Sequence, residues 1–427
     1  MVVIDFIIKN ILTQAAITIA LIAMLGLLLQ RKPVGSVLTG TFKTLLGFQV
    51  LSAGSAIIVG SLTYFGKIFQ HAFHLNGVVP SIEAINGQAM NALGLGNEIA
   101  FTFLGIFIVN ILIARFSPFK YIFLTGQALL WMATMTVVGG KVAGLNGLWT
   151  VVLGSIIGGI FAVAMPAAAQ PFVRKITGND AIALGHFCTV GYLVEAGTAY
   201  IFGERGENKH SVEDLKLPKS MEFLQDTYLS IAVIMVPLYM ITAAFAGPKW
   251  AGAGATNYIM NAFMQGIQFV VGVYVLLAGV RLLLGEIVPA FRGIAMKLVP
   301  NAKPALDCPV LFPYAPNSVI LGFITTTVGT VIGMFLMPVF GLAVILPGML
   351  TNFFAGGTAG IFGNVVGGRR GAIVGGIIHG LFITLLPALL VTALTRFGFV
   401  NASATDSDTI VAALMYAWII GPILKAV

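Results

Sequence analysis

Three ionisable side chains stand in apolar or broken segments where they could bind a polar solute. Asp307 lies in ALDCP, His186 in ALGHF, and Glu83 follows Ile82 in PSIEA. Carboxylates accept hydrogen bonds from hydroxyls, and ionisable residues at membrane depth commonly have a function. The simpler alternatives are that Asp307 caps a half-helix, that Glu83 lies in an external loop, and that His186 is a satisfied structural residue.

Two uncharged side chains could complete such a site. Gln127 offers a donor and an acceptor to hydroxyls, and Trp131, four residues on, would share its helix face and could stack on a ring. His379 and Arg281 also lie within apolar segments. We expect His379 to link helices and Arg281 to reach the cytoplasmic interface, so neither is assigned to the site.

The composition places the site in a membrane protein. The 427 residues are 58% hydrophobic, with 23 basic and 15 acidic side chains, 51 glycines and a mean hydropathy of +0.99. Apolar runs of about 20 residues recur, which predicts an all-α membrane protein, whereas a β-barrel would alternate apolar and polar residues. The net charge of +8 comes from basic residues at the ends of these runs, so nucleic acid is not an expected partner.

The sequence predicts no metal, cofactor or catalytic residue. Cys188 and Cys308 lie in apolar sequence without a CxxC motif, which argues against a disulfide framework or a zinc site. No GxxxxGK[ST] motif is present, so ATP hydrolysis is not expected. His210, in NKHSVED, matches no phosphosite pattern.

The apolar runs predict eleven transmembrane helices in a single polytopic chain, 1–427. The first is followed by Arg31 and Lys32 rather than by a cleavage site, so it is retained. An external amino terminus then places the strong basic clusters in cytoplasmic loops. The predicted helices are 11–30, 44–64, 98–116, 121–139, 148–172, 225–247, 259–286, 318–340, 342–362, 371–395 and 408–427.

Three segments interrupt this alternation. Residues 179–202 are apolar but flanked by basic residues on both sides, which predicts a re-entrant segment. Residues 77–97 and 302–316 are broken by proline, glycine and polar residues, and we expect half-helices there. Irregular backbone at membrane depth is tolerated where it lines a cavity, so all three are candidates for a solute pathway.

An internal repeat relates two of these broken segments. Residues 47–61 align with 272–286 at six identities in fifteen positions, and further glycine-rich matches follow in the same order. The first repeat covers about 40–200 and the second about 258–400, with 11–30, 225–247 and 408–427 as flanking helices. The copies begin on opposite sides of the membrane, so the repeats are inverted, and Ile82 aligns with Asp307.

The polar stretch 203–226 contains ten of the 38 charged residues. We predict that about 203–224 forms the cytoplasmic connection between the repeats. A charge run of this kind is commonly a solvated linker. The alternative is a docking surface for a soluble partner.

The chain resembles the ascorbate-specific IIC permease of the bacterial phosphoenolpyruvate-dependent phosphotransferase system. The resemblance rests on SVEDLKLP at 211–218, ALDC with FPYAPN at 305–317, LTG at 124–126 and IALGH at 182–186. It implies a homodimeric eleven-helix permease whose core domain moves like an elevator against a fixed domain. It also implies that soluble IIB and IIA components phosphorylate the substrate, L-ascorbate or a similar sugar acid, during uptake.

The resemblance carries over to the site only in part. His186 and Asp307 keep the family pattern, whereas Ile82-Glu83 replaces a Thr-Tyr pair, Gln127 and Trp131 replace a His and a Gln, and Phe187 replaces a Gln. These departures predict weaker ascorbate binding or a preference for a related sugar acid or polyol.

Two other classes of protein compete with this interpretation. Inverted repeats and buried carboxylates are also typical of a proton-coupled secondary transporter, in which Asp307 or Glu83 would take up the proton. A membrane receptor or scaffold fits poorly with three broken helices. The resemblance favours the phosphotransferase permease.

Overall fold

A computed structural model describes residues 15–74, 77–206, 209–215, 226–252, 254 and 256–426. Parts of four predicted segments lie outside the described residues: 11–14 of the first helix, 207–208 with 216–224 of the polar connection, 225 of the helix 225–247, and 427 of the helix 408–427. The described chain is mostly helical, and six of its helices are long and apolar enough to cross a membrane, which confirms the multi-pass all-α class. These are Val34–Phe73, Gly96–Phe116, Gly147–Thr177, Tyr258–Glu286, Pro316–Phe340 and Asn352–Phe397.

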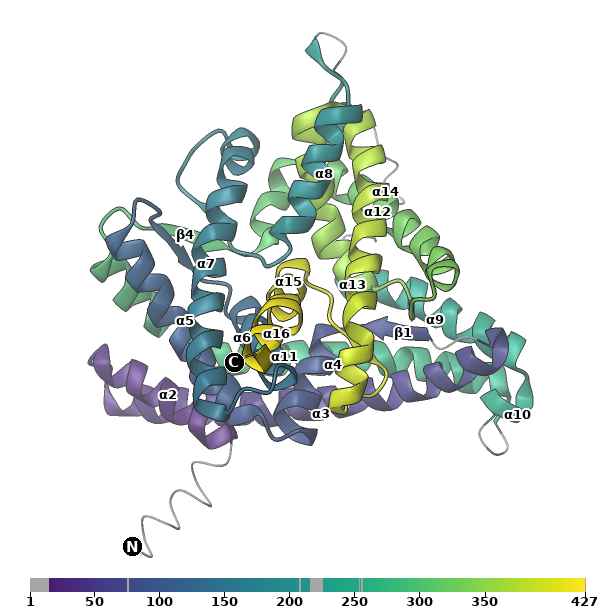
Figure 1. Ribbon diagram of the computed structural model, residues 1–427, viewed down its shortest axis with the longest axis horizontal. Helices are drawn as coiled ribbons and strands as arrows, with labels where there is room; N and C mark the ends of the chain where they lie inside the picture. Colours follow the sequence, from purple (N-terminus) through teal and green to yellow (C-terminus); the bar gives the residue numbers. More distant parts are fainter. Residues whose placement is uncertain are drawn as a thin grey trace, which may run out of the picture.

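The helices pack in two groups. The first group contains α2 (Ala15–Leu29), α3 (Val34–Phe73), α9 (Thr227–Ala246), the short α10 (Pro248–Ala251) and α11 (Tyr258–Leu298). In Figure 1, α3 runs along the bottom of the molecule, with α2 beside one end and α10 near the other. We call this group the lower layer.

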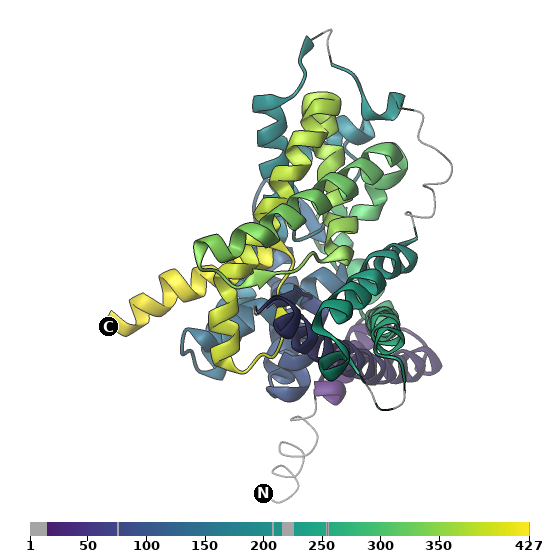
Figure 2. The same ribbon diagram turned by 90° about the vertical axis from the view of Figure 1, so that its right-hand side faces the viewer.

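The second group stands on the lower layer, and we call it the upper layer. The turned view in Figure 2 also shows its yellow-green helices above the purple ones. One part packs α5 (Gly96–Phe116) and α6 (Gly126–Val142) against α7 (Gly147–Thr177), and another packs α8 (Thr189–Phe202) and α12 (Pro316–Leu336) against α14 (Gly357–Phe397). Between them lie α4 (Ile82–Gly87), α13 (Met349–Thr351), α15 (Ser407–Met415) and α16 (Gly421–Ala426).

Glycines bring α3 and α11 into backbone contact. A Cβ on Gly54 would lie 2.3 Å from the Leu276 nitrogen, and a Cβ on Gly279 would lie 2.2 Å from the Leu51 nitrogen. Gly47 meets Leu283 at 2.3 Å in the same way. As the residue number rises along α3, the residue number of the contact partner on α11 falls, so the two helices are antiparallel. Small residues allow this close approach.

In the described part of the chain, six short strands form two small sheets, which the hydropathy pattern did not predict. β1 (Gly77–Pro80) lies between β5 (Val344–Ile345) and β6 (Ala402–Ser403), and β4 (Lys303–Leu306) lies between β2 (Tyr121–Phe123) and β3 (Ala183–Leu184). All four pairings are parallel. Each sheet therefore takes its central strand from one half of the chain and its outer strands from the other half.

These strands correct several predicted boundaries. The helix expected over 121–139 begins at Gly126, after β2, and the one expected over 342–362 is divided into β5, α13, a π-helical turn and the start of α14. The broken segment 77–97 contains β1 before its half-helix, and 302–316 contains β4 and a 3-10 helix (Cys308–Tyr314) instead of an α-helical half. In 179–202, β3 leads in and α8 leads out, while its depth in the bilayer stays a prediction.

The described part of the polar connection packs against the upper layer. Ser211 and Asp214 form a capping box around a 3-10 turn (Val212–Asp214). The Glu213 carboxylate accepts hydrogen bonds from the backbone N–H groups of Asn317 and Ser318, at 3.0 and 2.8 Å, at the start of α12. An acidic side chain is favourable at this positive end of a helix. Residues 211–215 of the SVEDLKLP string thus have a structural role.

Candidate solute-binding site

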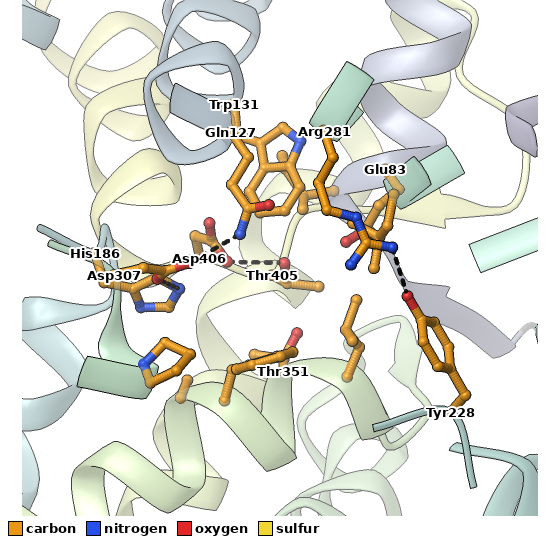
Figure 3. Close-up of a pocket in the computed structure, with 16 residues that line it drawn as sticks. Glu83, Gln127, Trp131, His186, Tyr228, Arg281, Asp307, Thr351, Thr405 and Asp406 are labelled. Atoms are coloured by element: carbon orange, nitrogen blue, oxygen red, sulfur yellow. Dashed lines mark hydrogen bonds and ion pairs between the residues drawn. The ribbon is translucent and has the colours of Figure 1, made fainter. Parts of the chain in front are cut away.

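The carboxyl-terminal ends of all six strands lead to one cavity of about 260 Å³. Ile82 and Glu83 follow β1, Gln127 and Trp131 follow β2, and His186 follows β3. Asp307 follows β4, Thr351 follows β5, and Thr405 with Asp406 follows β6. Figure 3 shows these side chains turned toward a common space. Because parallel strands expose their carboxyl ends at the same edge, two facing sheets place polar groups from six distant segments together.

Asp307 is the centre of the polar contacts. It caps the 3-10 helix that follows β4, where its Oδ1 accepts a hydrogen bond of 2.8 Å from the Cys308 N–H. Its Oδ2 accepts one of 3.0 Å from Gln127 Nε2. Its side chain remains 31% exposed to the cavity. Asp307 therefore acts as a cap and still offers acceptor capacity to a solute, so the two sequence-based alternatives are compatible.

His186 lies beside Asp307 and is held from behind. Its Nδ1 lies 2.6 Å from the Tyr192 hydroxyl, and its Nε2 lies 4.0 Å from Asp307 Oδ1. The Nδ1 contact fixes the ring orientation and turns Nε2 toward the carboxylate. A small oxygen-bearing ligand can reach both groups.

Glu83 and Trp131 form other parts of the wall. Glu83 is only 4% exposed and accepts a hydrogen bond of 2.9 Å from the Ser81 hydroxyl, which also caps α4. Its burial argues against a place in an external loop. The Trp131 side chain lines the cavity, while its indole N–H is buried and has no partner among the described residues.

Phe187 does not line the cavity. Its ring stacks on Phe123, with ring centroids 4.4 Å apart, and its carbonyl accepts a hydrogen bond of 2.9 Å from the Asp408 N–H. Of the predicted site residues, Phe187 is therefore not brought to this cavity, because the turn after β3 points His186 toward the cavity and the next side chain into the core.

The sequence analysis left out Arg281 and Asp406. Arg281 lines the cavity and donates a hydrogen bond of 3.1 Å to the Tyr228 hydroxyl, while its reach to the cytoplasmic interface stays a prediction. Asp406 is 4% exposed, accepts from Thr405 at 3.1 Å, and its Oδ2 has no partner among the described residues. The signal for Asp406 was the polar run at 403–409 between two apolar segments.

Two other assignments concern His379 and the cysteines. The Nδ1 of His379 lies 3.1 Å from the Thr326 hydroxyl, so it links α14 to α12 as expected. Both cysteines are buried free thiols, and Cys188 donates to Asp406 Oδ1 at 3.6 Å. Two overlapping sets place donor atoms within 4.8 Å of one another, close enough to hold a metal ion: His186, Asp307 and Cys308, and His186, Cys188 and Asp406. The sequence had predicted no such set.

The comparisons with known proteins identify the family of the chain. The "Ascorbate-specific PTS system EIIC component" of Mycoplasma pneumoniae is 27% identical to the chain over 449 residues, covering 90% of this chain. The chain spans 66% of that relative's length. The family described as "PTS system sugar-specific permease component" matches residues 10–408, so the resemblance read from the sequence is confirmed. The chain belongs to this family of phosphotransferase-system sugar permeases.

Proposed function

We propose that this permease takes up L-ascorbate or a related sugar acid across the bacterial cytoplasmic membrane. The observation that carries the proposal is the cavity itself, in which Asp307, Gln127 and His186 lie within one polar cluster in a chain of the sugar-permease family. The named activity of the Mycoplasma pneumoniae relative supports the choice of ascorbate.

The cavity chemistry suits a solute that carries both hydroxyls and an acidic group. Asp307 accepts hydrogen bonds from hydroxyls, and Gln127 can donate or accept. Arg281 supplies a positive charge for a carboxylate or enolate, which offsets part of the repulsion from Asp307, Glu83 and Asp406. The family departures at Ile82, Glu83, Gln127 and Trp131 all line this cavity, so we expect them to change the preference among sugar acids and polyols.

We infer further that the chain has eleven transmembrane helices in two inverted repeats. Both halves contain a long helix, a strand, a short helical segment and a helix of 21 residues in the same order. In the repeat alignment, Gly54 corresponds to Gly279 and Leu51 corresponds to Leu276. The contact of Gly54 with Leu276 is therefore the same contact as that of Gly279 with Leu51, with the two copies exchanged. Such exchange is expected from a twofold axis in the membrane plane.

Alternating access would follow from relative movement of the two layers. The cavity takes Tyr228, Leu277 and Arg281 from the lower layer and its remaining wall from the upper layer. A translation of one layer past the other would carry the strand-end residues while leaving Arg281 behind. In this elevator mechanism, one group of helices is fixed at the interface of a homodimer. A monomer with full uptake in bilayers would contradict the dimeric arrangement.

The chemistry of phosphorylation would come from soluble IIA and IIB components. The test is uptake by sealed vesicles that contain the purified permease, with and without the phosphorylated IIB component, IIA and phosphoenolpyruvate inside. We expect labelled ascorbate to accumulate as a phosphate ester only when all components are present. Accumulation of unmodified solute without the partners would overturn the proposal.

A proton-coupled secondary transporter is the second candidate, and buried carboxylates favour it. Glu195 of α8 is fully buried, and neither of its carboxylate oxygens has a partner among the described residues. Glu83 and Asp406 are also nearly buried beside the cavity. In the vesicle experiment, this candidate predicts accumulation of unmodified solute that follows an imposed proton gradient and is abolished by a protonophore.

A further inference from the structure

A second cavity lies at the opposite end of the sheet formed by β5, β1 and β6. It has a volume of about 790 Å³, and Gly77 and Ala402, the first residues of β1 and β6, lie in its wall. The central cavity lies beyond the carboxyl ends of the same strands. At about 3.3 Å per residue, the four residues of β1 separate the two cavities by roughly 13 Å. The second cavity is therefore close to the path toward the central site.

The wall of this second cavity carries positive charge without a carboxylate. Lys67, near the end of α3, and Arg396, in the last turn of α14, both line it and are both exposed. Neither forms an ion pair within the described part of the chain, although the Lys67 Nζ lies 5.8 Å from the Trp250 ring centroid. Two unpaired cations in a concave wall concentrate anions.

The corresponding end of the other sheet is arranged differently. There, Lys303 at the start of β4 pairs with Asp180, which also accepts a 2.8 Å hydrogen bond from Arg174 Nε. Gln170 donates a further hydrogen bond to Asp180 at 2.8 Å. Both basic residues at that end are paired with the Asp180 carboxylate, whereas no acidic residue among those described lines the cavity with Lys67 and Arg396. Basic residues without an ion-pair partner among the described residues thus distinguish this cavity from the end of the other sheet.

The loop that closes the cavity is held rigidly. Gln88 is 8% exposed and uses both ends of its amide on Val400, donating to its carbonyl at 3.0 Å and accepting from its N–H at 2.8 Å. The next residue, Asn401, adopts a left-handed conformation with φ of 47°. Gly66 of α3 leaves room for its amide, because a Cβ there would lie 3.3 Å from Asn401 Nδ2. The cavity wall is therefore preformed.

We propose that this cavity is an oxyanion-binding site at the external mouth of the permease, where the acidic group of the solute is held before it reaches the central cavity. The external position follows from the start of α3 beside Arg31 and Lys32, which the basic-residue pattern places in the cytoplasm, and from Lys67 near its far end. The identity of the solute rests on the proposed function. The phosphate of an anionic lipid has the same charge chemistry and is the other possible source of the oxyanion.

The charge of the site can be measured without transport. Thr395 lines the cavity, and both native cysteines are buried, so Thr395→Cys supplies an accessible thiol. In intact cells, the thiol is labelled by two impermeant methanethiosulfonate reagents, one with a sulfonate group and one with a trimethylammonium group. We expect the ratio of the sulfonate rate to the trimethylammonium rate to be roughly tenfold higher at Thr395→Cys than at Thr256→Cys, which lies outside the cavity. The added changes Lys67→Gln and Arg396→Gln should remove this difference.

The source of the oxyanion can be separated in the same variant. Ascorbate or sulfate that slows labelling in phosphatidylcholine vesicles identifies a small anion as the ligand. Slowing that requires phosphatidylglycerol in the vesicles identifies a lipid headgroup instead. Equal relative rates at Thr395→Cys and Thr256→Cys, or labelling only from the cytoplasmic side, would overturn the proposal.

Transport kinetics provide the functional test. The double variant Lys67→Gln, Arg396→Gln should raise the KM for ascorbate roughly tenfold at low ionic strength and leave kcat unchanged, with a difference that shrinks as salt is added. The matched control Lys43→Gln removes a charge outside the cavity, toward the other end of α3, and should leave KM unchanged. An unchanged KM in the double variant would overturn the role in solute capture. If the parent protein transports no ascorbate, the proposed function fails while the labelling result still decides whether the oxyanion site exists.

Discussion

At the scale of single residues, Asp307 is the most informative position. We expect Asp307→Asn to weaken solute binding by roughly ten- to hundredfold, corresponding to the loss of about 1.5 to 3 kcal/mol for a charged hydrogen bond. The amide retains an oxygen that can cap Cys308, so the fold should persist. Titration of the purified protein with ascorbate, sugar acids and pentitols measures the effect.

Two comparisons make the Asp307 result interpretable. His186→Ala should cause a smaller loss, because one ring nitrogen is already engaged by Tyr192. An unchanged melting temperature in Asp307→Asn would separate binding from folding. Unchanged affinity in that variant would remove Asp307 from the centre of the site, and tight, selective ascorbate binding by the parent would show that the family departures are silent.

Arg281 tests whether the solute is an acid. We expect Arg281→Gln to weaken the binding of ascorbate about tenfold and to leave the binding of a neutral pentitol unchanged, because only the former presents a negative charge to the guanidinium. Lys43→Gln is a matched control, since it removes the same charge at a surface pair with Glu286. Equal losses for the acid and the pentitol would assign Arg281 a packing role.

At the scale of elements, the contact between α3 and α11 should be sensitive to size. Gly279→Ala places a methyl group against the Leu51 backbone and should destabilise the protein by about 1 to 3 kcal/mol. Gly285→Ala on the same helix meets nothing within 4 Å and should be tolerated. Thermal unfolding in detergent measures both, and equal melting temperatures would contradict the packing argument.

The end of the second sheet should show an acid-dependent stability. Hydrogen bonds from Lys303, Arg174 and Gln170 hold the pKa of Asp180 well below its usual value of 3.8. A lowered folded-state pKa contributes stability above the unfolded pKa and loses it as the pH falls. Asp180→Asn should therefore lower the melting temperature at pH 7, and the difference should close below about pH 4.

Lys175→Gln provides the control for the Asp180 experiment. Lys175 is exposed beside Arg174, and its removal takes away a charge that does not titrate in the acidic range. The change in melting temperature caused by Lys175→Gln should therefore be the same at pH 3 and at pH 7, because no side-chain titration is lost. A pH-independent difference for Asp180→Asn as well would show that the ion pairs of Asp180 do not stabilise the fold.

At the scale of the whole molecule, transport should require movement between the two layers. Met235 of α9 and Leu350 of α13 line one small cavity of about 20 Å³ between the lower and upper layers. In a background with Cys188 and Cys308 changed to Ala, oxidation of Met235→Cys with Leu350→Cys should abolish uptake, and reduction should restore it.

A cross-link within one layer is the control. Ser61 of α3 donates a hydrogen bond of 2.7 Å to the Gln265 carbonyl of α11, so Ser61→Cys with Gln265→Cys joins two helices of the lower layer. This pair should retain uptake when oxidised. Full uptake by the oxidised variant Met235→Cys with Leu350→Cys would contradict the relative movement of the layers.

The sequence by itself determined the membrane class, most helical segments and several members of the site. Helix-length apolar runs are local, so α5 (Gly96–Phe116) lies close to its predicted range of 98–116. Gly54 and Gly279, noticed as aligned positions, meet the partner helix in equivalent ways. Asp307 was found because it is an ionisable group in a broken segment that the repeat places centrally, whereas His186 and Gln127 were found through the family resemblance.

Only the tertiary structure decided how these groups meet. Strands of two to four residues are too short for a periodic signal, and their pairing joins segments such as Gly77 and Val344 that are distant in the chain. The direction of a side chain after a strand is equally non-local, which is why Phe187 turned into the core and Arg281 into the cavity. Hydropathy records the burial of a segment, whereas a binding site depends on the convergence of six strand ends, which the packing of the whole chain sets.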